Sequence, residues 1–322
     1  MSESAQLTTL NNGFGALLTN VTRADLKDAE FKSHARSLWS EHRGLIAVRG
    51  DDLAAVTPEE LMEWSEVFGN IDEQRMAARD HAMVGATPIL RIGNITDDAG
   101  NRRASFAIVD PLKSADDIRY NPATRRPVWH TDSTFKPVPP IGSVFHCKQC
   151  PPTGGGTLFA DSAAAFTALD AATQTRLSTL EAVCSLAHHD KKISLYSPAY
   201  KTLNPEQRRA NPPNRVPLVL EHPVTGRPAL YGLNSSTCAI VEKGTAISEA
   251  QMDVFDLEGI EDESVQILRD LLPHATSAQF TVHWQWQPGD IVAWDNRCTM
   301  HAATGFEHAR YQREMWRLTL VQ

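Results

Sequence analysis

Two histidines and one aspartate in this chain have the types and spacing of metal ligands. His130 and Asp132 are separated by one residue, and His301 lies far downstream. On an extended segment, residues i and i+2 point the same way, so His130 and Asp132 can reach one ion together. Two imidazoles and one carboxylate on one face of a metal leave the other coordination positions open, as in non-haem Fe(II) oxygenases. The pattern therefore predicts a metal centre made by these three residues.

Two longer blocks of sequence surround the three residues. The first block comprises residues 128–135 (VWHTDSTF) and 151–161 (PPTGGGTLFAD), and the second comprises 288–301 (PGDIVAWDNRCTMH) and 312–317 (QREMWR). Together they resemble the taurine dioxygenase/TfdA family of Fe(II)- and 2-oxoglutarate-dependent dioxygenases. The stretch from Trp129 to Asp170 is most similar to members that act on aryloxyalkanoates. The resemblance covers most of the chain, from about residue 12 to about residue 320.

This resemblance implies a role for each matching residue. His130, Asp132 and His301 are expected to bind Fe(2+), leaving positions for 2-oxoglutarate, the co-substrate, and for O2. Arg313 matches the arginine that binds the distal carboxylate of 2-oxoglutarate. An arginine suits this role because a guanidinium pairs with a carboxylate through two parallel hydrogen bonds. Thr157 matches a hydroxyl that donates to the same carboxylate. Arg317 matches the arginine that holds the anionic group of the prime substrate.

The resemblance also implies an activity. We expect hydroxylation or oxidative cleavage of a small anionic organic substrate, with release of succinate and CO2. The aspartate at position 132 favours hydroxylation over halogenation, because halogenating relatives have a small residue there. An alternative with the same cofactors is desaturation or ring formation on an amino-acid-like acid in a biosynthetic pathway. The sequence leaves the identity of the prime substrate open.

Two rival interpretations come from other functional classes. A zinc-dependent hydrolase could use the same three ligands, since two histidines and a carboxylate also suit catalytic zinc. The chain lacks a nearby general base such as the glutamate of an HExxH motif, and Arg313 would have no role in such an enzyme. A non-catalytic jelly-roll binding module would not need all three ligands together with Arg313.

The sequence patterns of the helices and strands that must position these residues predict an α+β protein. Residues 22–43 have the apolar spacing of an amphipathic helix, and residues 45–48 read as a strand. Thr57 and Glu60 form a capping-box pattern with Pro58, which predicts a helix that stops near Gly69. These elements belong to an N-terminal α/β layer, about residues 12–126.

Short strands separated by turns dominate from about residue 127 to residue 322. Alternation over residues 280–286 predicts a half-buried strand, and residues 291–294 read as a buried one. Helices are expected at about 161–183 and 262–272. The resemblance implies a double-stranded β-helix (jelly-roll, cupin-like) core, so we expect a single domain over residues 1–322 with helical insertions.

The composition of the chain limits which partners and which cellular compartment we expect for the protein. A net charge of −8 argues against nucleic acid. The chain has no apolar run of transmembrane length and no signal-peptide pattern at Met1. Five cysteines, including Cys147 and Cys150, favour a reducing compartment and strand positions over disulfides. We therefore expect a cytoplasmic enzyme that contacts no membrane, and the family allows a homo-oligomer.

Several further residues occupy matching regions but have weaker assignments. Asn296 and Arg297 are interpreted as shaping the turn that delivers His301, and Trp129 as a packing residue. The remaining candidates for the substrate pocket are each interpreted as structural until tested: Asn94, Asn121, His188, His189 and Tyr231.

Overall fold

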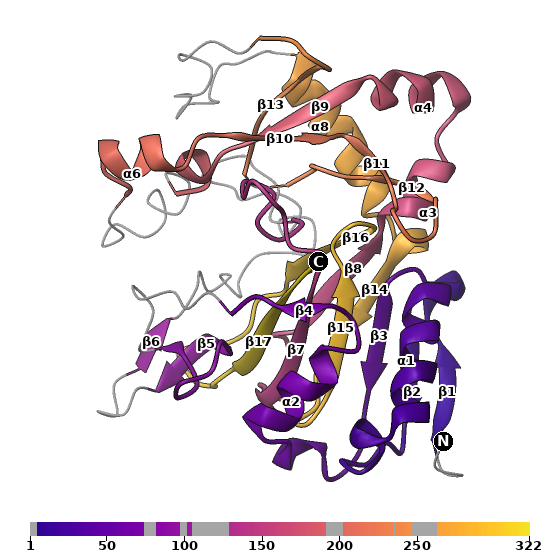
Figure 1. The fold of residues 1–322 in the computed structure, drawn as a ribbon, viewed down its shortest axis with the longest axis vertical. Helices are drawn as coiled ribbons and strands as arrows, with labels where there is room; N and C mark the ends of the chain where they lie inside the picture. Colours follow the sequence, from indigo (N-terminus) through magenta and orange to yellow (C-terminus); the bar gives the residue numbers. More distant parts are fainter. Residues whose placement is uncertain are drawn as a thin grey trace.

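Strands from both ends of the chain share one large sheet in the computed structural model, which describes residues 5–73, 82–96, 102–104, 129–190, 202–234, 236–246 and 263–322. The strand order is β1-β2-β3-β15-β7-β17-β5-β6, with β4 also paired to β17, and β2–β3 is the parallel pair. The strands are β1 Gln6–Thr9, β2 Ala16–Thr19, β3 Leu45–Val48, β4 Asn70–Ile71, β5 Leu90–Thr96, β6 Arg102–Ala104, β7 Gly142–Gln149, β15 Ile291–Asp295 and β17 Glu314–Val321. The N-terminal strands therefore extend the same sheet that holds β15 and β17 (Figure 1).

A second, three-stranded sheet packs against one face of the large sheet. Its order is β14-β8-β16, from β14 Thr281–Trp284, β8 Thr157–Asp161 and β16 Thr299–Ala303. Aromatic side chains fill the space between the sheets: the ring of Trp294 on β15 lies 4.8 Å from that of Phe145 and 5.4 Å from that of Phe159. This apolar layer fixes the position of β16, which carries His301.

Two helices cover the opposite face of the large sheet. They are α1 Ala29–Glu41 and α2 Pro58–Ser65, and their buried side chains, including Phe31 and Trp64, pack with residues of β3, β7 and β17. The capping box of Thr57 and Glu60 is confirmed, because each side chain bonds the other's backbone N–H.

The predicted helix over residues 22–43 is wrong at its beginning. The backbone N–H and hydroxyl of Thr22 both donate to the Asp25 carboxylate at 2.8 Å, which holds this segment in a turn. Asp28 then caps α1 by accepting from the N–H of Phe31. Short polar side chains close local turns in this way and compete with helix. Short 3-10 turns lie at Asn11–Gly13, Asp25–Lys27, Leu53–Ala55 and Ala278–Phe280.

A third group of elements lies above the two sheets in Figure 1. It contains a sheet of order β10-β9-β13, a hairpin β11-β12 and several helices. The strands are β9 Leu180–Cys184, β10 Asn214–Pro217, β11 Val219–Glu221, β12 Pro228–Leu230 and β13 Thr237–Glu242; the helices are α3 Ser162–Thr167, α4 Ala171–Ser178, α6 Pro205–Ala210 and α8 Glu263–Ala275.

The single helix predicted over residues 161–183 is also wrong. Asp161 and Asp170 are two separate N-caps, so the segment forms two short helices, α3 and α4. The apolar run that follows becomes the buried middle strand β9. The predicted helix at 262–272 is present as α8, which continues to Ala275. In the part of the chain that the structure describes, no helix has the length and apolar character needed to cross a bilayer.

Candidate active site

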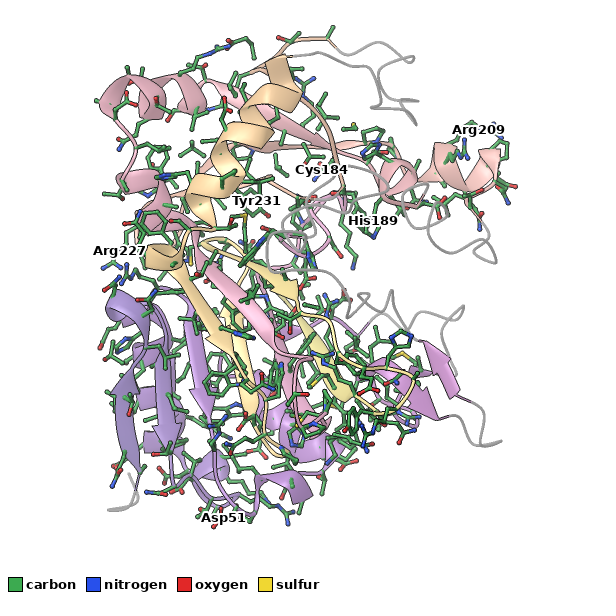
Figure 2. All side chains as sticks on the ribbon, turned by 180° about the vertical axis from the view of Figure 1, so that it is seen from behind. Asp51, Cys184, His189, Arg209, Arg227 and Tyr231 are labelled. Carbon is green, nitrogen blue, oxygen red and sulfur yellow. The ribbon has the colours of Figure 1, made fainter. Side chains whose placement is uncertain are left out.

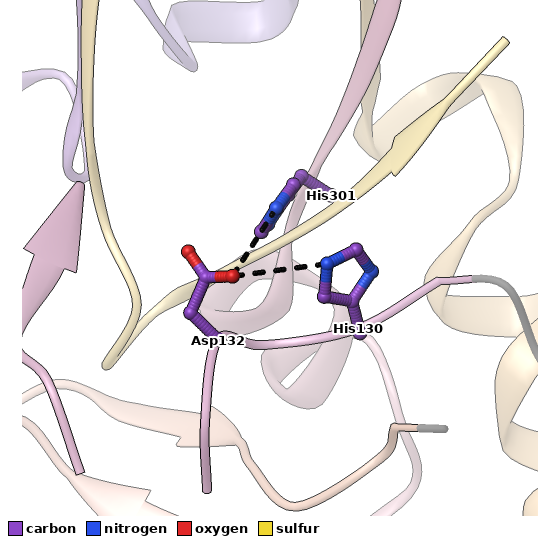
Figure 3. Close-up of side chains that lie close together, drawn as sticks. All are labelled: His130, Asp132 and His301. Atoms are coloured by element: carbon purple, nitrogen blue, oxygen red, sulfur yellow. Dashed lines mark ion pairs between the residues drawn. The ribbon is translucent and has the colours of Figure 1, made fainter. Parts of the chain in front are cut away.

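The three predicted metal ligands lie side by side. His130 and His301 face each other as a bridged pair, and each backbone N–H donates to the other's carbonyl at 2.9 Å. Their ring centroids are 4.2 Å apart. The Asp132 Oδ1 atom lies 3.8 Å from the Nε2 atom of both histidines (Figure 3). Strand β16 and the segment after Trp129 thus bring distant parts of the sequence to one point.

These distances suit a shared metal ion better than direct contact. A separation of 3.8 Å is too long for a hydrogen bond. Two atoms that each lie about 2.1 Å from one ion are at most about 4.2 Å apart. The three ligand atoms all lie within 4.8 Å of one another, so a small contraction would place them around one ion.

The surroundings hold both groups in the protonation states that metals require. Burial, followed by the neighbouring charges of His130 and Arg317, lowers the pKa of His301 to about 3, so its imidazole is neutral near pH 7. Burial opposes the charged form of Asp132, but Arg317 and the two histidines outweigh it and hold its pKa well below the usual range. Neutral imidazole and ionised carboxylate are the forms that bind metal.

The second oxygen of Asp132 is held by two donors. Its Oδ2 atom accepts a 2.9 Å hydrogen bond from the Ser143 hydroxyl and lies 3.0 Å from the Arg317 Nη2 atom. Oδ1 is therefore the oxygen turned toward the histidines. Sequence reasoning missed Ser143, since a serine in a buried strand carries no signal of its own. It also placed Arg317 at the substrate and did not foresee this ion pair.

Arg313 is a buried cation without an acidic partner among the described residues. It precedes β17, its Nε donates to the Gly155 carbonyl at 2.9 Å, and burial lowers its pKa to about 10. Only 7% of the residue is exposed, and no carboxylate lies within ion-pair distance in the described ranges. An unpaired buried charge is costly, so the site favours an anionic ligand.

Neighbouring residues prepare the Arg313 site. Asn94 on β5 accepts from the Arg313 backbone N–H at 2.8 Å, and its amide donates to two carbonyls of the preceding loop. Asn94 therefore positions Arg313. Gly155 has a φ of +65°, and a Cβ there would meet Pro151 at 2.8 Å, so a larger residue would disturb the loop that receives the guanidinium.

Thr157 lies two residues beyond Gly155 at the start of β8. Its buried Oγ1 accepts a 3.0 Å hydrogen bond from the indole Nε1 of Trp286, another residue that sequence reasoning missed. A hydroxyl that accepts in this way keeps its own proton free to donate. The role predicted for Thr157, donation to a carboxylate, is therefore compatible with its surroundings.

The remaining candidates lie in structural positions or outside the description. Tyr231 is buried in an apolar cluster that also contains Cys184 (Figure 2). His189 stacks on Phe135 with ring centroids 6.3 Å apart, and His188 is buried. Trp129 packs in the same apolar cluster as Tyr231. Asn121 lies outside the described residues.

A second group of metal-ligand types lies where β15 ends and is formed by His222, Asp295 and Cys298. Asp295 is already neutralised, because Arg297 binds both its oxygens at 2.8 and 2.6 Å and His222 lies 3.0 Å away. Burial, followed by the charge of Asp295, raises the pKa of the Cys298 thiol well above its ordinary value. The ion pair between Arg297 and Asp295 closes the turn after β15, which agrees with the interpretation of Arg297 as a residue that shapes this turn.

Comparison with known proteins agrees with this geometry. The model of the family described as "Taurine catabolism dioxygenase TauD, TfdA family" matches residues 5–319. The (S)-phenoxypropionate/alpha-ketoglutarate-dioxygenase of Delftia acidovorans is 31% identical over 100% of this chain and 96% of its own length. Pentalenolactone F synthase of Streptomyces arenae is 26% identical over 86% of this chain and 83% of its own length. The crystal structure of AAD-2 in complex with Mn(II) and N-oxalylglycine covers 98% of this chain and 97% of that chain, with a TM-score of 0.69 and 24% identity, which shows a shared fold.

The chain belongs to the TauD/TfdA family of dioxygenases. It is an oxidoreductase that depends on 2-oxoglutarate, and the paired His130, Asp132 and His301 fit the Fe(II) ion that this class of enzyme uses. The predictions of family, enzyme class and cofactors are confirmed.

Proposed function

We propose that this enzyme hydroxylates, or oxidatively cleaves, a small organic anion of the aryloxyalkanoate type. His130, Asp132 and His301 would hold Fe(II), and the two facing sheets would form the double-stranded β-helix of one domain spanning residues 1–322. The observation that carries the 2-oxoglutarate part of the proposal is Arg313, a buried guanidinium with no acidic partner in the described ranges. The free state of all five cysteines supports a reducing compartment such as the cytoplasm.

The protein's own residues would prepare the reaction by binding and orientation. When bound, Fe(II) with 2-oxoglutarate and O2 supplies the oxidation, which turns a substrate C–H into C–OH and yields succinate and CO2. Arg313 and Thr157 would hold the distal carboxylate of 2-oxoglutarate. Ser143 would keep Asp132 turned so that Oδ1 faces the ion. If the hydroxylated carbon also bears an ether oxygen, the product falls apart and hydroxylation becomes cleavage.

Arg317 would recognise the anionic group of the prime substrate. Its Nη2 atom pairs with Asp132, but a guanidinium has five N–H donors, and its buried Nε atom has no hydrogen-bond partner among the described residues. The remaining N–H groups could donate hydrogen bonds to a substrate carboxylate beside the metal site. The relative from Delftia acidovorans, which is named for phenoxypropionate, supports a carboxylate joined to an aryl ether.

A second outcome of the same cofactor chemistry is a biosynthetic oxidation such as desaturation or ring formation. The similarity to pentalenolactone F synthase supports this alternative. The two outcomes differ in which C–H lies nearest the oxidant. The two rival functions considered in the sequence analysis, a zinc hydrolase and a non-catalytic binding module, do not explain why Arg313 is buried without an acidic partner among the described residues.

The proposal is tested by measuring succinate release with a panel of substrates. The panel contains phenoxypropionate, phenoxyacetate, taurine and the neutral methyl ester of phenoxypropionate, each with Fe(II), 2-oxoglutarate and O2. We expect the aryloxy acids to stimulate succinate release at least tenfold over the ester. The substrate assignment would be refuted if the ester worked equally well or taurine worked best.

A variant of Arg317 tests whether its side chain binds the substrate or serves only the ion pair with Asp132. Arg317→Ala should raise KM for the aryloxy acid at least tenfold while leaving the affinity for 2-oxoglutarate unchanged. Arg310→Ala, at a largely exposed arginine, is the matched control. If Arg317→Ala instead weakens metal binding and leaves KM unchanged, Arg317 serves Asp132 alone and the substrate role is wrong.

A further inference from the structure

A second cleft lies on the far side of the turn that leads to His301. It is open to solvent and is formed by α1, the loop between β11 and β12, and the turn residues Asp295, Arg297 and Cys298. None of the predicted metal ligands, nor Arg313 or Arg317, lines it. Four arginines and two apolar side chains dominate its walls: Arg36, Arg43, Arg227, Arg297, Trp39 and Val224.

Two of the four arginines have acidic partners. Arg297 is bound to both oxygens of Asp295. Arg43 pairs with the buried Asp161 through a 2.6 Å contact between Nη1 and Oδ2. Because each carboxylate cancels one guanidinium, these pairs contribute no net charge to the cleft.

The other two arginines leave the cleft with an excess of positive charge. Arg36 donates to the carbonyls of Val67 and Phe68, which are neutral acceptors. Arg227 is exposed and makes no ion pair with a described carboxylate. Among the described residues, the four guanidiniums of the cleft therefore face two nearby carboxylates, Asp161 and Asp295, which leaves an excess of positive charge. Burial, followed by repulsion from Arg297, lowers the pKa of Arg36, although Asp295 partly offsets both effects.

The cleft also offers apolar surface beside this charge. The Trp39 ring is nearly fully buried and lies 5.0 Å from the guanidinium of Arg36, so the exposed apolar surface comes from Val224 instead. Val224 is 66% exposed, which is unusual for a large aliphatic side chain. A ligand that matches both features carries two negative charges at one end and a small apolar group at the other.

We propose that this cleft binds a small phosphate monoester, at a site separate from the catalytic centre. Guanidinium groups pair with phosphate oxygens through parallel hydrogen bonds, and a phosphate monoester carries close to two negative charges at neutral pH. The excess charge of Arg36 and Arg227 matches that number. Arg297 and Cys298 border the cleft, and His301 follows three residues later on β16.

Calorimetric titration of the whole chain with phenyl phosphate tests this proposal. Titrations are made with and without Mn(II) and 2-oxoglutarate, and with inorganic phosphate and succinate as comparison ligands. We expect phenyl phosphate to bind more tightly than inorganic phosphate, and both to bind more tightly than succinate. Failure of phenyl phosphate to bind, or tighter binding of succinate, would overturn the assignment.

Charge reversal at an exposed arginine locates the binding site. Arg227→Glu should weaken phenyl phosphate at least tenfold, the scale for losing one charge-assisted contact. Arg209→Glu, on α6 at the other end of the molecule, is the matched control and should change nothing (Figure 2). Unchanged binding in Arg227→Glu would refute the site.

A third variant distinguishes this proposal from the proposed function. Arg313→Ala should lose affinity for 2-oxoglutarate and keep full affinity for phenyl phosphate. If phenyl phosphate is lost in Arg313→Ala but not in Arg227→Glu, the anion occupies the catalytic site and the second site does not exist. If 2-oxoglutarate binding survives in Arg313→Ala while Arg227→Glu loses phenyl phosphate, the cofactor assignment fails and this one stands.

Discussion

Replacing Ser143 by alanine should weaken metal binding although Ser143 is not a predicted ligand. Its hydroxyl donates to Asp132 Oδ2 at 2.9 Å, and both side chains are buried. A hydrogen bond to a charged group contributes about 1.5–3 kcal/mol. Arg317 still holds the same oxygen in the variant, so the lower end of this range applies. About 1.4 kcal/mol corresponds to a tenfold loss of affinity, which agrees with the effect of removing an outer partner of a metal ligand.

The assay is an anaerobic calorimetric titration with Mn(II) or Fe(II) in the presence of 2-oxoglutarate. Ser65→Ala is the matched control, because Ser65 is equally buried and donates one 2.7 Å hydrogen bond to the Leu61 carbonyl on α2, remote from the metal site. We expect a loss of about tenfold in Ser143→Ala and none in Ser65→Ala. Metal affinity within twofold of the parent, or an equal loss in both variants, would refute the role of Ser143.

Three further predictions follow from single residues. Arg313→Ala should weaken 2-oxoglutarate by about 2–3 kcal/mol without affecting Mn(II) alone, measured by calorimetry, and an unchanged affinity would contradict its assignment. Burial lowers the pKa of His146 to about 3, so the unfolded state takes up its proton first and stability falls as pH drops from about 6.5 to 3. Denaturant melts should show a shallower pH dependence in His146→Gln, by up to roughly 4 kcal/mol over this window, and parallel curves would exclude His146 as a cause. Gly44→Ala should lower Tm more than Gly226→Ala, because both have positive φ but only a Cβ at Gly44 meets Asp295 at 2.6 Å and Cys298 at 2.8 Å; equal shifts would show that the crowding is harmless.

The metal site was predictable because its signal is local and chemical. A histidine and an aspartate two residues apart indicate one half of the site, and a matching block supplies His301. The sequence pattern also located β3, the start of α2 and β15, where caps and apolar runs are unambiguous. In each case, the residues that specify the element lie close to one another in the sequence.

Features that depend on distant parts of the chain were not predictable. Ser143 approaches Asp132 only because β7 lies beside β15 and β17 in the large sheet. The relative placement of Arg313 and Arg317 depends on the sheet as well, because β17 begins at Glu314 and its register with β7 shifts between Glu314 and Met315. Leu180–Cys184 continues an apolar helical pattern, and only pairing with β10 and β13 makes it a strand.

The paired backbones of His130 and His301 have a consequence for how the protein folds. About 170 residues of chain separate two residues that exchange both of their main-chain hydrogen bonds. Closing so long a loop costs conformational entropy before any contact compensates for it, so this pair is a late event in folding. All three residues can bind one ion only in molecules that have closed this loop. We therefore expect the apparent affinity for metal to fall with the fraction of molecules in which the loop is closed.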